Sequence, residues 1–195
     1  VYFGLKREYM EYDEVFSNVI TEVRRELAKE DTPPPSFMIM RPSSQLIKMI
    51  TDPPRNALYP SQNLDGDIFS DISAALGGSL ATASSIIVSQ EGTMLFEAPH
   101  GTAHDLYVRY QESGGKEAHF NPSALVYALG NALETLALNE GNDELAGYAL
   151  ALKQALKETV ADGIVTADLK GKTTDPDAEK VVDLYGFIDA LQERL

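Results

Sequence analysis

The sequence predicts an α/β fold in which helices outnumber strands. Three long segments, 12–30, 121–138 and 143–163, carry apolar residues at the steps of three and four that are typical of an amphipathic helix. Two short runs, SIIVS (85–89) and TMLFEA (93–98), are rich in β-branched or apolar residues and flank the turn QEG (90–92), which indicates a pair of strands. Long helices combined with short strands indicate the α/β class.

The first part of the chain alternates helices with short extended segments. The helix over 12–30 is expected to end at DTPPPS (31–36), because three prolines cannot continue it. FMIM (37–40) predicts a short strand and SSQLIKMI (43–50) a short helix, and the turn-rich TDPPRN (51–56) follows. ALYPS (57–61) is expected to be a strand leading into a helix from Asp67 to Leu76.

The second part of the chain begins after Gly77-Gly78, the best candidate for a domain boundary or hinge. The helix over 121–138 has Asn121 at its N-cap and Pro122 in its first turn, with a leucine stripe along one face. The stripe consists of Leu125, Leu129, Leu133 and Leu136. The helix over 143–163 is closed by Gly163, and KGKTTDPD (170–177) leads into a last helix over 179–195.

Composition excludes several classes of function. The net charge of −14, from 16 basic and 30 acidic residues, argues against sequence-independent binding to nucleic acid or to an anionic membrane. The absence of cysteine excludes disulfides, zinc–thiolate sites and cysteine nucleophiles. No apolar run approaches the ~20 residues of a spanning helix, and no signal peptide is visible. The chain begins at Val1 rather than Met, so we expect it to be one piece of a longer protein. We expect that protein in the cytoplasm or, in a eukaryote, in the mitochondrial matrix.

The stretch NLDGDIFSD (63–71) places three aspartates within seven positions. If a helix begins near Asp67, the carboxylates of Asp67 and Asp71 lie on one face about one turn apart. Two hard oxygen donors at that separation suit Mg²⁺ or Mn²⁺, with water and a chelating substrate completing the shell. The alternative is that Asp65 or Asp67 only caps the helix, and spacing alone favours the cap.

A second group of polar residues, FEAPHGTAHDLY (96–107), comes directly after a predicted strand. Gly101-Thr102 lets backbone amides approach a ligand, and strand exits are where α/β proteins bind nucleotides. Taken alone, the pattern is weak, because a histidine such as His100 is more often structural than catalytic; His119 is interpreted as a surface residue. The chain contains no GxGxxG or GxxxxGK[ST] motif, so the usual Rossmann and P-loop phosphate sites are not expected.

Three blocks in order, NLDGDIFSDISAALGGSLATAS, FEAPHGTAHDLY and FNPSA (120–124), together resemble the β-decarboxylating isocitrate and isopropylmalate dehydrogenases. Isocitrate dehydrogenase is the nearer match, and a weaker similarity extends from FGLK (3–6) to the final helix. The resemblance implies that fold with only its C-terminal part present. Residues 1–77 would form a small region on the side of the substrate and the metal, which also makes the dimer contact. Residues 78–195 would form part of the large domain on the side of the dinucleotide.

The resemblance also implies roles for individual residues. Asp67 and Asp71 would hold Mg²⁺ or Mn²⁺, and Lys6 would be the proton-transfer lysine that reaches into the neighbouring subunit's site in a homodimer. Asn121 would contact the adenine. The full set implied to line the dinucleotide pocket is Glu97, His100, Gly101, Thr102, Ala103, His104, Asp105, Leu106 and Asn121.

The cofactor implied by the resemblance is NAD. In the family, the two positions directly after the HGTAH stretch help to select the cofactor. NADP-using relatives have basic or phosphate-binding groups there, whereas NAD users have Asp followed by an aliphatic residue. This chain has Asp105-Leu106 at these positions. A carboxylate accepts hydrogen bonds from ribose hydroxyls and repels a 2′-phosphate. The reaction would be the oxidative decarboxylation of a 2-hydroxy acid, as in the tricarboxylic acid cycle.

The chain departs from the family pattern in two ways. Isocitrate dehydrogenases commonly place a third metal aspartate on the helix corresponding to SSQLIKMI, where Ser43 and Ser44 stand here, and no stretch matches the substrate-binding first half. The chain alone is therefore expected to be inactive. Three readings stay open: the C-terminal portion of an NAD-dependent isocitrate dehydrogenase, or of an enzyme for a related substrate such as isopropylmalate; a noncatalytic or regulatory subunit; and a helix-rich interaction domain whose aspartates only cap helices.

Overall fold

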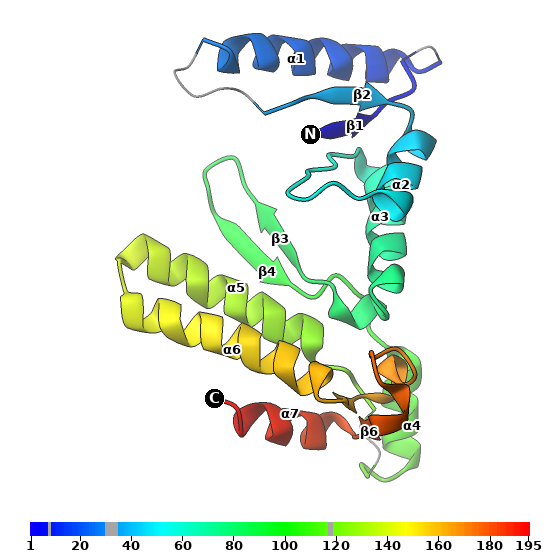
Figure 1. The fold of residues 1–195 in the computed structure, drawn as a ribbon, viewed down its shortest axis with the longest axis vertical. Helices are drawn as coiled ribbons and strands as arrows, with labels where there is room; N and C mark the ends of the chain where they lie inside the picture. Colours follow the sequence, from blue (N-terminus) through cyan, green and yellow to red (C-terminus); the bar gives the residue numbers. More distant parts are fainter. Residues whose placement is uncertain (8, 30–34, 117–118) are drawn as a thin grey trace. The chain divides into compact units, whose positions relative to one another are not determined.

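The computed structural model describes residues 1–7, 9–29, 35–116 and 119–195. The chain divides into two compact units, Val1–Ile72 and Ser73–Leu195 (Figure 1). The helix-rich α/β composition is confirmed. Among the described helices, none is long and apolar enough to cross a membrane. The proline segment expected to end the first helix lies largely outside the described residues.

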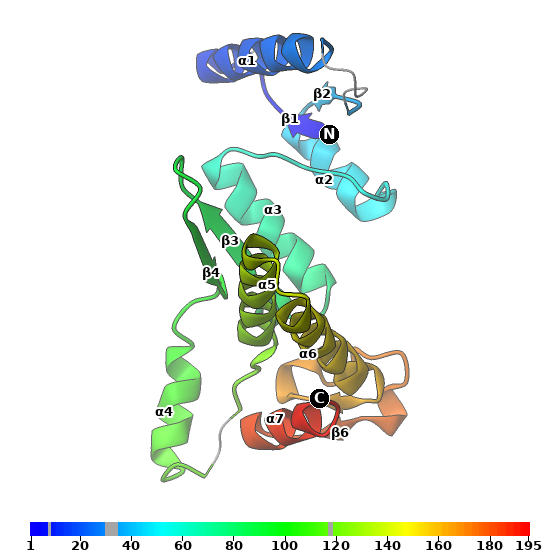
Figure 2. The ribbon, with the colours of Figure 1, turned by 90° about the vertical axis from the view of Figure 1, so that its left-hand side faces the viewer.

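The first unit is built around two short parallel strands. Strand β1 (Tyr2–Gly4) pairs with β2 (Met38–Met40), and helices α1 (Glu11–Leu27) and α2 (Pro42–Thr51) lie on opposite sides of the pair (Figures 1 and 2). Phe3 stacks on Phe37 at 6.0 Å between ring centroids, and Phe16 of α1 meets Phe3 edge-on at 6.3 Å. Burial of these rings with Ile20 holds α1 on the strands.

A buried glutamine joins three segments of the first unit. The Gln45 side chain of α2 is fully buried, and its Nε2 donates to the backbone oxygens of Tyr2 (2.7 Å) and Pro60 (3.3 Å). The backbone N–H of Tyr2 also donates to the oxygen of Leu58. Residues 57–61, which we expected to be a strand, are therefore tied to β1 without forming regular strand structure.

Helix α3 (Asn63–Leu76) contains the break between the two units. It begins four residues before Asp67, because the backbone N–H of Gly66 already bonds to the oxygen of Gln62 at 2.7 Å. The expectation of a helix starting at Asp67 was therefore wrong at its N-terminal end. Asp65 lies in the first turn and Asp67 lies inside the helix, so Asp67 is not its cap.

The second unit consists of a strand hairpin, a helical hairpin and a C-terminal segment. Strands β3 (Ser85–Val88) and β4 (Met94–Glu97) are antiparallel, and α4 (His104–Glu112) follows them. Helices α5 (Ser123–Glu140) and α6 (Asp143–Ala161) run side by side, with the β3–β4 hairpin against α5 (Figure 1). The remaining elements are η1 (Leu80–Thr82), β5 (Ile164–Val165), η2 (Ala167–Leu169), η3 (Pro176–Ala178), β6 (Lys180–Val181) and α7 (Leu184–Gln192).

The core of the second unit lies between α6 and α7, where Leu152, Leu156, Phe187 and Leu191 are buried together. The leucine stripe expected on α5 is divided: Leu125, Leu129 and Leu136 are about half exposed, whereas Leu133 packs against the core between α6 and α7. The buried residues of α5 are small, among them Ala124, Ala128, Gly130 and Ala137. Small residues let α5 approach α6 closely, which leaves Leu125, Leu129 and Leu136 on the outer face.

Candidate functional site

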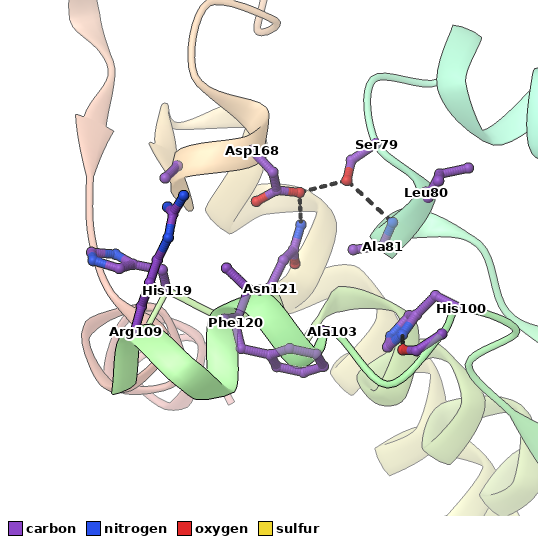
Figure 3. Close-up of a pocket in the computed structure, with 13 residues that line it drawn as sticks. Ser79, Leu80, Ala81, His100, Ala103, Arg109, His119, Phe120, Asn121 and Asp168 are labelled. Carbon is purple, nitrogen blue, oxygen red and sulfur yellow. Dashed lines mark hydrogen bonds between the residues drawn. The ribbon is translucent and has the colours of Figure 1, made fainter. Parts of the chain in front are cut away.

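A cavity of about 440 Å³ opens in the second unit where the chain leaves β4. Four separate stretches form its walls: the start of the η1 segment, the loop from β4 into α4 with part of that helix, the residues just before α5, and η2 (Figure 3). We call it the first cavity. Its lining residues are Ser79, Leu80, Ala81, His100, Gly101, Ala103, Leu106, Arg109, His119, Phe120, Asn121, Ala167 and Asp168.

His100 presents an unsatisfied ring nitrogen in this cavity. Its Nδ1 lies 3.0 Å from the backbone oxygen of Gly101, and its ring meets Phe120 edge-on at 5.5 Å between centroids. The Nε2 atom is buried and has no hydrogen-bond partner within the described parts of the chain. A buried polar atom without a partner is costly, which makes Nε2 a candidate to bond to a ligand.

Asn121 and Asp168 form a hydrogen-bonded group on the cavity wall. The Asp168 carboxylate accepts bonds from Ser79 Oγ (2.5 Å), Asn121 Nδ2 (2.9 Å) and Thr166 Oγ1 (2.6 Å), and Figure 3 shows Ser79, Asn121 and Asp168 pointing toward one another. Burial alone raises the pKa of the Asp168 carboxyl, but the bonds from Asn121, Ser79 and Thr166 outweigh burial and hold the pKa below its ordinary value. The group therefore stays ionised and fixes the wall.

The same group fixes the side chain of Asn121. Its Oδ1 accepts the backbone N–H of Ser123 at 2.9 Å, at the start of α5, while its Nδ2 donates to Asp168. The residue is only 3% exposed. The predicted adenine contact of Asn121 would therefore use the remaining hydrogen-bonding capacity of an amide that is already held at both ends.

Ala103 stands at the turn from the loop into α4. It has φ of 51° and ψ of 42°, a left-handed conformation that is uncommon for a residue other than glycine. Its carbonyl oxygen accepts the N–H groups of Leu106 and Tyr107, which starts the helix. Strained backbone of this kind concentrates at functional sites, and here it turns the chain along the edge of the first cavity.

The structure divides the predicted dinucleotide residues into three groups. His100, Gly101, Ala103, Leu106 and Asn121 line the first cavity. His104 and Asp105 instead line a neighbouring groove along the start of α4, together with Ala103, Leu106 and Arg109. Glu97 and Thr102 line neither of these two spaces; the Glu97 carboxylate accepts Ser85 Oγ at 3.0 Å across the β3–β4 hairpin.

Sequence reasoning missed several residues of the first cavity. Ser79 lies in the GGSLATAS block that carried the family resemblance, so that block offered a signal for it. Asp168 and Arg109 stand in segments with no motif, and only folding brings Asp168 to Asn121 across 47 positions. His119, interpreted as a surface residue, is half-buried and lines the cavity.

The predicted metal ligands lie in the first unit. Asp67 and Asp71 are exposed and four positions apart on α3, which puts them on one face about one turn apart. Carboxylate oxygens are donors that Mg²⁺ and Mn²⁺ prefer, so this pair could supply two ligands to such an ion. Within the described residues no group of three or more histidine, aspartate or glutamate side chains gathers as a metal site. Further ligands would therefore have to come from water, substrate or a partner.

Lys6 follows β1 and is held through its backbone. Its N–H donates to Asp13 Oδ2 at 2.6 Å, while Gln62 Nε2 donates to Asp13 Oδ1 at 2.7 Å. Asp13 is only 6% exposed, whereas the side chain of Lys6 is exposed. One buried carboxylate thus connects the backbone of Lys6 with the residues that lead into α3.

A cavity at the exit of a strand, bordered by the first turn of a helix, is the kind of site at which α/β proteins bind nucleotides. The chain matches the isocitrate/isopropylmalate dehydrogenase family over residues 6–185 and belongs to that family. This confirms the resemblance stated from the sequence and the fold it implied.

Relatives in this family are similar to the chain over part of their length. Mitochondrial NADP isocitrate dehydrogenases from Sus scrofa and Homo sapiens are 36% identical over 115 residues, which is 58% of this chain and 27% and 25% of theirs. Isocitrate dehydrogenase from Methylococcus capsulatus is 26% identical with a TM-score of 0.73, covering 99% of this chain and 49% of that one. The chain therefore spans about half the length of the solved relatives.

A second solved structure supports the fold. Isocitrate dehydrogenase from Ostreococcus tauri, determined in complex with isocitrate and magnesium(II), has a TM-score of 0.73 at 22% identity and covers 100% of this chain and 50% of its own. The mammalian relatives carry NADP in their names, so the expectation of NAD gains no support from them.

Proposed function

We propose that this chain forms the dinucleotide-holding and metal-ligating part of a metal-dependent isocitrate dehydrogenase that uses NAD. The observation that carries the proposal is the first cavity, because five of the residues predicted to line the dinucleotide pocket meet there at the exit of β4. The chain covers about half of the solved relatives, and the substrate-selecting residues are proposed to belong to the other half. The chain alone is expected to bind ligands without turning over substrate.

In the proposed reaction, hydride passes from the secondary alcohol of isocitrate to the nicotinamide, and the ketone formed lies β to a carboxylate that departs as CO₂. A divalent ion held by Asp67 and Asp71 would supply the positive charge that stabilises the enolate. Lys6 would deliver the final proton. Asp13 supports this role, because it fixes the backbone at Lys6 and leaves the ammonium group exposed.

The choice of NAD is proposed from Asp105. Its carboxylate lies in the first turn of α4, in the groove beside the first cavity, where it would accept bonds from ribose hydroxyls and repel a 2′-phosphate. NADP is the alternative with its own support. Arg109, one helical turn further on, lines both the groove and the cavity, and the curated relatives use NADP by name.

The test is a fluorescence titration of the 195-residue chain with NADH and with NADPH. We expect NADH to bind more tightly. Asp105→Lys should shift the ratio of the two dissociation constants toward NADPH by about tenfold, since it replaces repulsion of the phosphate by attraction. Asp177→Lys, at an exposed position in η3, controls for the change in net charge. Tighter binding of NADPH by the unmodified chain would overturn the NAD assignment.

A homodimer with a shared site is part of the proposal. Leu64 and Ile68, four positions apart on α3, are 70% and 47% exposed, and by helical geometry they border the face that carries Asp67 and Asp71. Exposed apolar side chains beside candidate metal ligands support a subunit contact there, with a partner completing the ligand set.

A noncatalytic subunit is the second candidate. Ser43 and Ser44 occupy the first turn of α2, where the family commonly has a metal aspartate. Turnover of isocitrate by the full-length protein with Mn²⁺ and NAD separates the two candidates, because a regulatory subunit would bind ligands without turnover.

A further inference from the structure

A second cavity, of about 400 Å³, lies in the second unit behind the residues that wall the first. The two cavities share wall segments. Just before and at the start of α5, Asn121 lines the first cavity and Ser123 the second. In η2, Asp168 lines the first cavity and Leu169 the second. The volume falls in the range of small-molecule sites. None of the residues proposed for the dehydrogenase reaction lines this cavity.

Part of the wall of the second cavity is apolar. Leu156 and Val160 of α6 and Leu169 of η2 contribute aliphatic walls, and Tyr127 of α5 contributes an aromatic ring. Burial raises the pKa of the Tyr127 hydroxyl, so that group stays neutral at ordinary pH. These residues suit contact with the hydrocarbon or aromatic part of a ligand.

The wall of the second cavity also includes a residue with an unsatisfied hydroxyl, Ser123. Ser123 is 3% exposed, its Oγ is buried, and that atom has no hydrogen-bond partner within the described parts of the chain. By contrast, two threonine hydroxyls of the wall are already used: Thr82 Oγ1 donates to the backbone oxygen of Ser79 and Thr173 Oγ1 donates to Glu179. A buried hydroxyl without a partner costs free energy, and an acceptor oxygen of a ligand would remove that cost.

The charge of the second cavity is opposite to that of the chain. The chain has a net charge of −14, yet the lining residues include Lys157 and Lys172 and no aspartate or glutamate. The Lys172 ammonium already donates to the backbone oxygen of Gly78, whereas the exposed Lys157 ammonium makes no side-chain bond to another described residue. Local positive charge beside an apolar wall favours an anion with an apolar body.

We propose that the second cavity binds a small organic carboxylate, with its oxygens on Ser123 Oγ and the Lys157 ammonium and its apolar body against Leu156, Val160 and Leu169. The assignment does not depend on the proposed dehydrogenase activity, because it rests on the orphaned hydroxyl, the charge and the volume of a different cavity.

The experiment is an amide-resolved NMR titration of the 195-residue chain with benzoate, and with benzamide as the uncharged counterpart. Benzoate is expected to shift the amides of Ser123, Val160 and Leu169 and to bind about tenfold more tightly than benzamide. Lys157→Gln and Ser123→Ala should each weaken benzoate binding by about tenfold, since each removes a bond to the carboxylate.

Lys29→Gln serves as the matched control, because it removes one exposed ammonium from the first unit, and it should leave benzoate binding unchanged. Equal binding of benzamide, or full binding by both Lys157→Gln and Ser123→Ala, would overturn the proposal. So would shifts confined to Ala103 and His119, which would place benzoate in the first cavity.

Discussion

Asp168 organises the first cavity although no sequence motif marks it. Its carboxylate accepts hydrogen bonds from Ser79 after α3, from Asn121 before α5 and from Thr166 before η2. These partners approach one another only after folding, so the role of Asp168 is a property of tertiary structure. Because Asn121 is fixed through Asp168, the geometry of the predicted adenine contact depends on a residue that does not itself need to touch the nucleotide.

Asp168→Asn should lower the free energy of unfolding at neutral pH by about 1.5–3 kcal/mol, since it replaces a charged acceptor of three bonds by a neutral amide. The pKa of Asp168 is lowered on folding. Its stabilisation is therefore present above the unfolded pKa and lost as pH falls through the folded value. Urea unfolding should show the gap between wild type and variant closing below about pH 4.

Asp177→Asn, at an exposed position in the same unit, is the control and should show no such gap at neutral pH. A difference between Asp168→Asn and wild type that stays constant down to low pH would show that the carboxylate charge does not carry the stabilisation.

At the scale of elements, α5 and α6 depend on small residues for their contact. A Cβ added at Gly130 of α5 would lie 2.7 Å from Lys153 Cγ, and Lys153 Nζ bonds to Glu134 at 2.6 Å. A Cβ added at Gly147 of α6 would meet nothing within 4 Å. A glycine-to-alanine substitution can therefore be compared at a crowded helical position, Gly130, and at an open one, Gly147.

Gly130→Ala should destabilise the protein by about 1–3 kcal/mol through overpacking, whereas Gly147→Ala should stabilise it by about 0.5–1 kcal/mol through helix propensity. Thermal unfolding followed by circular dichroism measures both. If the two variants shift Tm in the same direction, there is no room limit at Gly130, and the predicted overpacking between α5 and α6 is wrong.

Helix α3 presents the carboxylates of Asp67 and Asp71 on one face, as the proposed metal site requires. Mn²⁺ should raise the Tm of the unmodified chain, because a ligand that binds only the folded state stabilises it. Asp67→Asn and Asp71→Asn should each abolish the rise. Asp65→Asn, two positions from Asp67 and on a different side of α3, should retain it. A Tm that is insensitive to Mn²⁺ in the unmodified chain would count against metal binding.

Across the whole molecule, exposed apolar residues stand out in both units. Ile47, Leu64 and Ile68 in the first unit and Ile87, Leu95 and Leu129 in the second are each 47–70% exposed. Apolar side chains in such number favour association with further protein surface. In the first unit we assign this surface to the proposed homodimer.

Analytical ultracentrifugation should therefore detect a dimer of the chain, and Leu64→Asp combined with Ile68→Asp should convert it to a monomer, because burying two carboxylates at an apolar contact is costly. Leu138→Asp, at a 75% exposed position near the end of α5, should leave the dimer intact. A monomeric unmodified chain, or a dimer that survives the double substitution, would contradict the assignment to α3.

Local sequence indicated the helices other than α4, the β3–β4 hairpin and the family, because helical periodicity, β-branched runs and the three motif blocks are each set by near neighbours in the chain. It placed the starts of α3 and α7 wrongly, since α3 begins at Asn63 and α7 at Leu184. It also located the loop after β4 and the aspartate pair of α3. Only the tertiary structure decided that Leu125, Leu129 and Leu136 of α5 face outward while Leu133 packs inward, that His119 lines the first cavity, and that Asp168 holds Asn121. These depend on contacts between distant segments, which are selected by packing and by the need to pair buried polar groups, and no local pattern records them.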